Sequence, residues 1–320
     1  MALVHEQLLE PIRYLTSLPS KDVRGRFIAS VAADFALDLR SEYLDAVAAL
    51  THALHTASLA LDDIEDATQV RRGHPAAHVV FGTPLTINAA CLSIFEACTE
   101  FSKTIAAIDC PLDRQLTANR VVQEELVLLH VGQGKDILWR ELSYVPSLSE
   151  YREMTEGKTG GLFRLIARLL LVLSPLATGR NDDLVALSND LGYLFQIMDD
   201  FLNVVSPPVC NGLSTGTCDD FTEGKASFLV VHHCACVGAN DSRLRLALRQ
   251  RSADCNVKLQ CWSLLVETNS FAFAVSHIKA FSNDLTNRLQ RWLDRDDGEV
   301  ATLIRSLQDR VPTAALNSSR

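Results

Sequence analysis

Two groups of acidic residues are the part of this sequence best suited to chemistry. The first reads Asp62-Asp63-Ile64-Glu65-Asp66, and the second ends the run Gln196-Ile197-Met198-Asp199-Asp200, with Asn203 close behind. On a helix, residues four positions apart share a face, so Asp62 should lie beside Asp66 and Asp199 beside Asn203. Both groups follow long apolar stretches, which places them near helix C-termini, where the helix dipole disfavours negative charge.

Carboxylates gathered at such a place repel one another, and bound divalent cations would explain their presence. Hard oxygen ligands suit Mg²⁺, which proteins usually hold with one or two carboxylates plus the phosphates of a substrate. One acidic group alone is more often a solvated helix end than a metal site. Two groups facing each other are what a site holding several cations around a diphosphate would need.

The elements that must position these residues read as helices. Apolar residues recur at three- and four-residue steps toward the first acidic group, at Leu44, Val47, Leu50, Leu54 and Leu61. Similar patterns cover residues 87–101, 116–130, 162–173 and 184–202, and turn-rich segments separate them. The run 228–231 is the one β-like stretch, and we expect it to be helical. These patterns predict an all-α bundle with its site between facing helices.

Composition narrows the function and the location. The chain has 320 residues and no low-complexity linker, so we expect a single domain over residues 1–320. Its net charge of −9 argues against a nucleic-acid partner, which would require a basic surface. The first residues lack the basic segment and apolar core of a secretory signal, and the longest apolar run, 169–173, is too short for a membrane span. We therefore expect a cytoplasmic protein without a membrane span.

Further motifs strengthen the diphosphate interpretation. They are Leu18-Pro19-Ser20-Lys21, Arg71-Arg72-Gly73, Gly132-Gln133-Gly134-Lys135-Asp136, Lys158-Thr159-Gly160-Gly161 and Glu223-Gly224-Lys225. In this order, from about Pro11 to Phe228, the motifs resemble those of the trans-isoprenyl diphosphate synthases, and among these the geranylgeranyl diphosphate synthases of fungi and animals. The resemblance implies an isoprenoid-synthase-type helical bundle with the active site in a central cavity.

The resemblance also implies a reaction. A prenyltransferase of this kind condenses isopentenyl diphosphate with dimethylallyl, geranyl or farnesyl diphosphate through an allylic cation, using up to three Mg²⁺ ions per active site. It implies a homodimer or an assembly of dimers, and geranylgeranyl diphosphate as the product. Three alternatives stay open: a shorter or longer product (C10, C15 or C25), a synthase-like class I terpene cyclase, and a non-catalytic partner subunit. A cyclase needs no isopentenyl diphosphate site, and a non-catalytic subunit would be expected to lose an acidic group.

The roles that the resemblance implies fall into three sets. The metal ligands are Asp62, Asp66 and Asp199, with Asp63 and Asp200 as neighbours that contribute. The residues on the allylic diphosphate side are Arg71, Lys158, Thr159, Gln196, Asn203 and Lys225, and those of the isopentenyl diphosphate site are Lys21, Arg24, His55 and Arg72. The aspartates of the metal site, together with Lys158 and Lys225, would be the catalytic residues. Cationic side chains suit both diphosphates on charge grounds, although His55 on an apolar stretch could equally be a core histidine.

Product length depends on the path of the growing chain. We expect the tail to pass the small residues Ala57 and Ser58 and to stop at Ile94-Phe95, with His130 completing the floor. A stop at Phe95 favours a twenty-carbon product. The segment 204–220 carries no lysine, whereas relatives place one there to help cover the allylic diphosphate.

Overall fold

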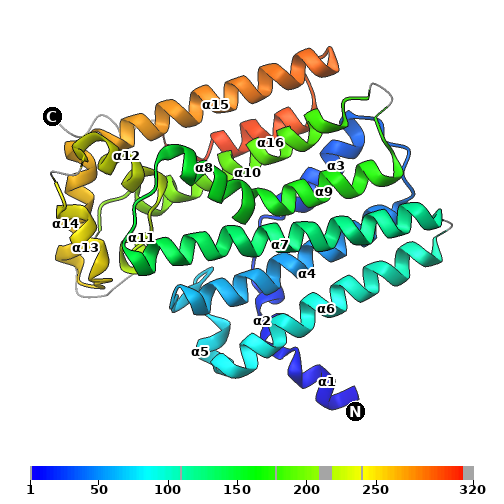
Figure 1. Ribbon diagram of the computed structural model, residues 1–320, viewed down its shortest axis with the longest axis horizontal. Helices are drawn as coiled ribbons and strands as arrows, with labels where there is room; N and C mark the ends of the chain where they lie inside the picture. Colours follow the sequence, from blue (N-terminus) through cyan, green and yellow to red (C-terminus); the bar gives the residue numbers. More distant parts are fainter. Residues whose placement is uncertain (1, 109, 177–178, 209–217, 239–240, 313–320) are drawn as a thin grey trace. The chain divides into compact units, whose positions relative to one another are not determined.

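The computed structural model describes residues 2–108, 110–176, 179–208, 218–238 and 241–312 (Figure 1). These residues are almost entirely helical, which confirms the all-α prediction. The chain divides into two compact units, which interleave along the sequence: unit 1 comprises residues 1–126 and 162–185, and unit 2 comprises residues 127–161 and 186–320. The single domain expected over residues 1–320 stays a prediction. Helices α7 (Leu112–Leu142) and α10 (Asn181–Val204) each pass from one unit into the other.

Unit 1 is built around two long helices that run side by side, α4 and α6 (Figure 1). Its elements are α1 (Ala2–Leu8), α2 (Glu10–Ser17), α3 (Val23–Asp34), α4 (Ser41–Glu65), β1 (Val70–Arg71), β2 (His74–Pro75), α5 (Ala77–Phe81), α6 (Thr83–Ala107) and most of α9 (Gly160–Leu173). The two short strands pair in an antiparallel hairpin, and they are the only strands among the described residues. Pro84 lies in the first turn of α6, where its missing N–H costs no helical hydrogen bond.

Buried aromatic residues tie α9 to the N-terminal helices within unit 1. The rings of Phe27 and Phe163 meet edge to face with centroids 5.3 Å apart, and both side chains are fully buried. The buried Tyr43 hydroxyl donates to the Leu169 carbonyl at 2.6 Å, which satisfies the polar end of that ring. Complete burial of each such ring contributes roughly 1.5–3 kcal/mol to stability. These contacts fix α3, which carries Arg24, and α4, which carries the first acidic group.

Unit 2 contains most of the C-terminal half of the chain. Its elements, besides parts of α7 and α10, are α8 (Leu148–Lys158), α11 (Asp219–Glu223), α12 (Phe228–Val237), α13 (Arg243–Arg249), α14 (Cys255–Glu267), α15 (Ser270–Leu293) and α16 (Glu299–Gln308). The run 228–231 lies within α12, so the expectation of a helix there is confirmed. Ser147 and Glu150 form a reciprocal capping box that starts α8.

An aromatic cluster forms part of the core of unit 2. Tyr193 lies edge to face with Phe228 and Phe281, at centroid distances of 6.4 and 5.2 Å. Tyr151 packs on Phe228 at 5.7 Å. The cluster joins α8, α10, α12 and α15, and so holds in place the helices that carry the second acidic group.

Helix α4 is the one described helix that is long and apolar enough to cross a membrane by length and composition. A buried helix of a globular core passes the same test. In this chain α4 packs against α2, α3 and α6, and ten of its side chains are buried. Its composition is therefore explained by core packing and is weak evidence for a span.

Candidate active-site residues

The first acidic group lies where the sequence predicts, at the C-terminal end of α4. Asp66 is the C-cap, and its N–H donates to the Asp62 carbonyl at 2.8 Å. Asp62 and Asp66 are one turn apart and partly exposed, whereas Asp63 between them is fully buried. The buried carboxylate of Asp63 is thus separated from those of Asp62 and Asp66, which solvent reaches.

A two-residue hairpin turn brings Arg71 back to this helix end. The turn residues Arg72 and Gly73 both have positive φ, at 55° and 80°, which a tight turn between twisted antiparallel strands favours. Arg71 donates through Nε to Asp63 Oδ1 at 2.8 Å and through a terminal nitrogen to the same oxygen, and it approaches Asp62 Oδ2 at 3.5 Å. Burial raises the pKa of Asp63, and Arg71 opposes that rise. Asp63 therefore anchors Arg71, and its position does not fit a metal ligand.

A second group in unit 1 gathers positive charge. Burial lowers the pKa of Arg24 to about 10, and Arg72 lowers it further while Asp22 opposes. Burial and then Arg24 and Arg72 hold the pKa of His55 well below its usual value, so this imidazole is neutral at pH 7. The Arg24 Nε atom is buried and has no hydrogen-bond partner.

Burial is the largest cause of these shifts, and the repulsion between Arg24 and Arg72 adds to it. An incoming phosphate would offset that repulsion, and Arg24 and Arg72 have the donor geometry to bind it. Three of the four residues predicted for the isopentenyl diphosphate site thus lie within one another's field. The fourth, Lys21, is exposed in the segment that leads into α3.

The second acidic group shows the same inward and outward division in unit 2. Asp200 is fully buried, and it accepts hydrogen bonds from Tyr151 Oη at 2.5 Å, the Phe228 N–H at 2.7 Å and Gln196 Nε2 at 2.7 Å. Asp199, its neighbour on α10, is exposed. Asp200 is thus a structural anchor, and Asp199 is the carboxylate of the pair that a ligand can reach.

Gly132 and Gly192 allow close contacts between helix backbones near Lys158 and Thr159. A Cβ on Gly132 would lie 2.3 Å from the Lys158 nitrogen, and one on Gly192 would lie 2.3 Å from the Gly160 Cα, so neither position has room for a side chain. Each contact brings two backbones together, α7 with the end of α8 and α10 with the start of α9. One turn beyond the second contact, Thr159 Oγ1 donates to Gln196 Oε1 at 2.5 Å.

Lys158 and Lys225, the two lysines predicted for the allylic diphosphate side, are both held by buried carboxylates. Lys158 Nζ donates to Asp136 Oδ2 at 2.6 Å. Lys225 Nζ lies 3.1 Å from Asp200 Oδ1 and 3.7 Å from Asp220 Oδ1. Burial alone would lower the pKa of Lys225, but Asp200, Asp220 and Asp136 outweigh it and leave the pKa well above its usual value. Lys225 is therefore charged at neutral pH, and ion pairs fix the position of both ammonium groups.

Asn203, whose role at the allylic diphosphate stays a prediction, also joins two helices of unit 2. Its Oδ1 accepts from the Asp220 N–H at 3.2 Å, which ties the start of α11 to α10. Burial raises the pKa of Asp220 well above its usual value, against the effect of Lys225. Residues 209–217 of the lysine-free segment 204–220 lie outside the described residues.

The donor atoms fit Mg²⁺. The carboxylates that solvent reaches, Asp62, Asp66 and Asp199, are hard oxygen ligands of the kind that Mg²⁺ takes in ones and twos beside substrate phosphates. Within the part of the chain that the structure describes, no three His, Cys, Asp or Glu side chains group as a metal site. A site that depends on the substrate's phosphates for its remaining ligands does not require such a group.

Comparison with known proteins decides the family. A model of the polyprenyl synthetase family matches residues 5–265, which is most of the chain. The chain belongs to the polyprenyl synthetase family. The members of this family are prenyltransferases, and the all-α fold and the paired acidic groups agree with the match.

Several fungal members of the polyprenyl synthetase family are similar along most of their length. Geranylgeranyl pyrophosphate synthase dpasD of Apiospora sacchari is 42% identical over 266 residues, which are 82% of this chain and 74% of the relative. Geranylgeranyl pyrophosphate synthase olcC of Penicillium canescens is 38% identical over 286 residues, covering 89% and 80%. Geranylgeranyl pyrophosphate synthase dpmaD of Metarhizium anisopliae is 40% identical over 314 residues, covering 97% and 84%.

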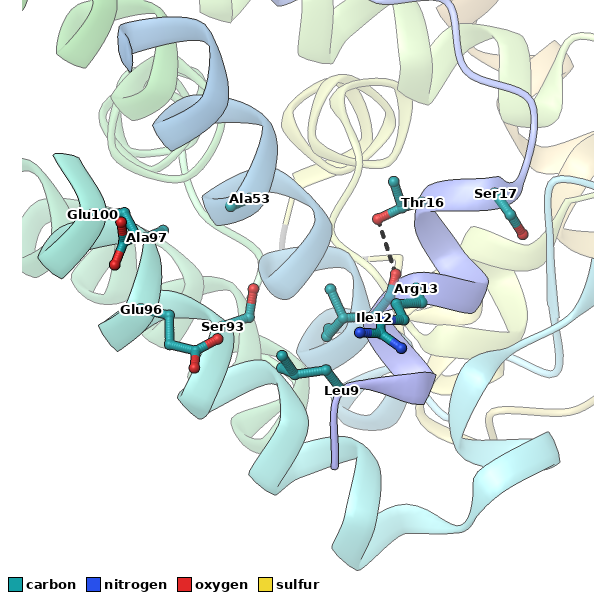
Figure 2. A pocket seen from close by; sticks show the side chains of 10 residues that line it. All are labelled: Leu9, Ile12, Arg13, Thr16, Ser17, Ala53, Ser93, Glu96, Ala97 and Glu100. Atoms are coloured by element: carbon teal, nitrogen blue, oxygen red, sulfur yellow. Dashed lines mark hydrogen bonds between the residues drawn. The ribbon is translucent and has the colours of Figure 1, made fainter. Parts of the chain in front are cut away.

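A cavity of about 440 Å³ in unit 1 is lined by none of the site residues that the sequence predicts. Figure 2 shows it between α2 and α6, with Ala53 of α4 at its floor. Ala53 precedes Asp62 by nine residues, or two and a half helical turns, so the two residues face opposite sides of α4. The cavity therefore lies on the helix face that Ala53 shares with Ala57, and not on the face of Ser58 and Asp62.

The expected floor of the product path stays a prediction. Phe95 is 70% exposed on α6 of unit 1, and His130 is exposed in unit 2. Ile94 is partly buried and packs on a cluster that contains Ala57, Ala60 and Ala90. Ala57 is therefore part of the helix contact between α4 and α6, whereas Ser58 shares the helix face of Asp62 and lies beside the proposed path.

Sequence reasoning passed over three residues that organise this polyprenyl synthetase site. Asp136, Tyr151 and Asp220 are all buried, and each contacts a residue that the sequence singled out. Asp136 lies one turn after Gly132 in the segment Gly132-Gln133-Gly134-Lys135-Asp136, so a signal was present. Nothing local in the sequence shows that Tyr151 and Asp220 meet Asp200 and Lys225.

Proposed function

We propose that this prenyltransferase makes geranylgeranyl diphosphate by condensing isopentenyl diphosphate with an allylic diphosphate. The observation that carries the proposal is the group of Arg24, Arg72 and the neutral His55, in which two guanidinium groups lie close enough to lower the pKa of Arg24. A terpene cyclase binds one diphosphate and has no use for a second anion site in addition to the one near Lys158 and Lys225. The names of the fungal relatives support the twenty-carbon product.

The reaction breaks the allylic C–O bond, forms a C–C bond to the double bond of isopentenyl diphosphate, and then loses a proton. Lys158 and Lys225, held charged by buried carboxylates, would bind the allylic diphosphate and stabilise the leaving pyrophosphate. Thr159 and Gln196 would fix its orientation, and Arg24, Arg72 and Lys21 would bind isopentenyl diphosphate. Asp62, Asp66 and Asp199 would hold up to three Mg²⁺ ions, which supply Lewis-acid stabilisation of the departing pyrophosphate.

One assay tests the proposal. Purified protein is incubated with Mg²⁺, isopentenyl diphosphate and each of dimethylallyl, geranyl and farnesyl diphosphate, and the chain length of the products is measured. A twenty-carbon product from farnesyl diphosphate is expected, and chelation of Mg²⁺ should stop its formation. Conversion of an allylic diphosphate to a hydrocarbon or alcohol without isopentenyl diphosphate would instead identify a cyclase.

Assembly is a separate proposal. Ile87 and Phe95 leave 41% and 70% of their side chains exposed on α6, which suits a contact with a second copy of the chain. We expect a homodimer, or an assembly of dimers, in sedimentation at micromolar concentration, and Ile87→Asp should weaken it. Only monomer at that concentration would refute the proposal. The cytoplasmic location expected from the sequence also stays a prediction, which a fluorescent fusion in cells tests.

A further inference from the structure

Asp136 is a buried carboxylate to which the proposed reaction assigns no role. It lies on α7 with 1% of its surface exposed, and its Oδ2 accepts from Lys158 Nζ at 2.6 Å. The other oxygen, Oδ1, is buried and has no hydrogen-bond partner. A buried oxygen without a hydrogen-bond partner lowers the stability of the fold, so stability alone does not account for Asp136.

The backbone contact at Gly132 and Gly157 explains why this pair is so close. A Cβ on Gly132 would meet the Gly157 carbonyl carbon at 2.7 Å and the Lys158 nitrogen at 2.3 Å. Asp136 follows Gly132 by one turn on the same face of α7, and Lys158 follows Gly157 directly. The glycines therefore let α7 and α8 cross closely enough for a short aspartate side chain to reach the lysine ammonium.

Three positively charged side chains act on Asp136. Lys158 of α8, Lys225 after α11 and Arg140 on α7 itself all favour the ionised carboxylate, and together they outweigh its burial and lower its pKa. A buried ion pair is often no better for stability than apolar residues of the same size. A gain in stability therefore does not by itself explain why a buried carboxylate lies at position 136, close to Lys158, which the proposed function needs.

We propose that Asp136 is a positioning residue for prenyl transfer, which holds the Lys158 ammonium at the place where it meets the allylic diphosphate. The inference rests on the proposed function, in which Lys158 binds that diphosphate. A lysine ammonium has three donors, so one can stay on Asp136 while two bind phosphate oxygens. A lysine side chain has a flexible stem of four carbons, and an ion pair with a fixed anion removes much of its conformational freedom.

Negative charge grows on the leaving diphosphate as the allylic C–O bond breaks. The position of the Lys158 ammonium therefore affects the energy of the transition state more than that of the bound substrate. Asp136→Asn, which keeps the shape and removes the charge, should lower kcat by about ten- to a hundredfold, with a smaller change in the KM for farnesyl diphosphate. Asp136→Glu keeps the charge, and it should retain more activity than Asp136→Asn.

A double-mutant cycle separates positioning from a structural role. If Asp136 acts through Lys158, then Asp136→Asn combined with Lys158→Gln should lose no more kcat than Lys158→Gln alone. The double variant leaves no unpaired buried charge, so it tests the inference even if Asp136→Asn alone fails to fold. Glu153→Gln is the matched control, because Glu153 and Lys135 form an exposed ion pair between the same two helices; its kcat should equal that of the wild type.

The outcomes are distinct. Equal losses from Asp136→Asn in the wild-type and Lys158→Gln backgrounds would overturn the inference, and so would a folded Asp136→Asn variant with wild-type kcat. Wild-type protein without prenyl transfer activity would overturn the proposed function itself. Binding of inorganic pyrophosphate with Mg²⁺, measured by calorimetry, should weaken in Lys158→Gln and should then not weaken further when Asp136→Asn is added.

Discussion

The two aspartates of the second acidic group are adjacent in sequence and should respond oppositely to the same substitution. Asp199 is exposed, and Asp200 is fully buried with donors from Tyr151, Gln196 and the Phe228 N–H, and with Lys225 at 3.1 Å. We expect Asp199→Asn to remove activity with little loss of stability. Asp200→Asn should chiefly destabilise the fold.

The magnitudes follow from these contacts. An asparagine at position 200 keeps one acceptor oxygen, but its NH₂ group faces the donors that Asp200 now accepts from. It also leaves the Lys225 ammonium without its nearest carboxylate. Removal of one partner from a buried ion pair costs about 3–5 kcal/mol, which changes the ratio of folded to unfolded protein by roughly two to four orders of magnitude. An exposed substitution at position 199 should stay within about 0.5 kcal/mol, while loss of a metal-binding carboxylate should lower kcat by about a hundredfold or more.

Urea unfolding followed by circular dichroism measures the stability of both variants, and product formation with saturating Mg²⁺ measures kcat. Glu153→Gln, at an exposed position on α8, is a suitable surface control for both measurements. Near-normal activity of Asp199→Asn, or wild-type stability of Asp200→Asn, would refute the division into a reachable ligand and a buried anchor.

Three other outcomes are expected. Arg24→Ala should raise the KM for isopentenyl diphosphate roughly ten- to a hundredfold and that for the allylic substrate much less; equal changes in both would contradict a separate site. Burial depresses the pKa of His55, so below about pH 6.5 the imidazole is protonated in the unfolded chain but stays neutral in the folded chain. The free energy of unfolding should therefore fall as the pH drops below about 6.5. Urea unfolding of His55→Gln should show a smaller fall. Ser58→Phe should shorten the product because a phenyl ring one turn before Asp62 fills the path, and Phe95→Ala should lengthen it if Phe95 forms the floor. Chromatography of the products tests both, and an unchanged product from both variants would show that the path lies elsewhere.

Local sequence predicted much of the fold and part of the site. Helical periodicity located α4, α6, α9 and α10, and four-residue spacing identified the aspartates at the end of α4. It did not predict the hairpin turn in which Arg72 takes a left-handed conformation, because an arginine there gives no turn signal. It did not predict that Ile87 and Phe95 are exposed on α6, because an apolar pattern on a helix does not show which of its faces is buried.

The glycine-rich motifs show how spacing and long-range packing combine. Taken alone, Gly132-Gln133-Gly134-Lys135 and Lys158-Thr159-Gly160-Gly161 suggest loops that bind phosphate through backbone N–H groups. In the structure Gly132 lies in the middle of α7, and Gly157 and Gly160 lie at the end of α8 and the start of α9. Their missing side chains allow helices to touch, and the polar residue one turn beyond each contact then reaches its partner, Asp136 at Lys158 and Gln196 at Thr159. The glycines thus act on the proposed diphosphate site indirectly, and alanine at Gly132 or Gly192 should disturb Lys158 and Thr159 by separating helices whose backbones are now in contact.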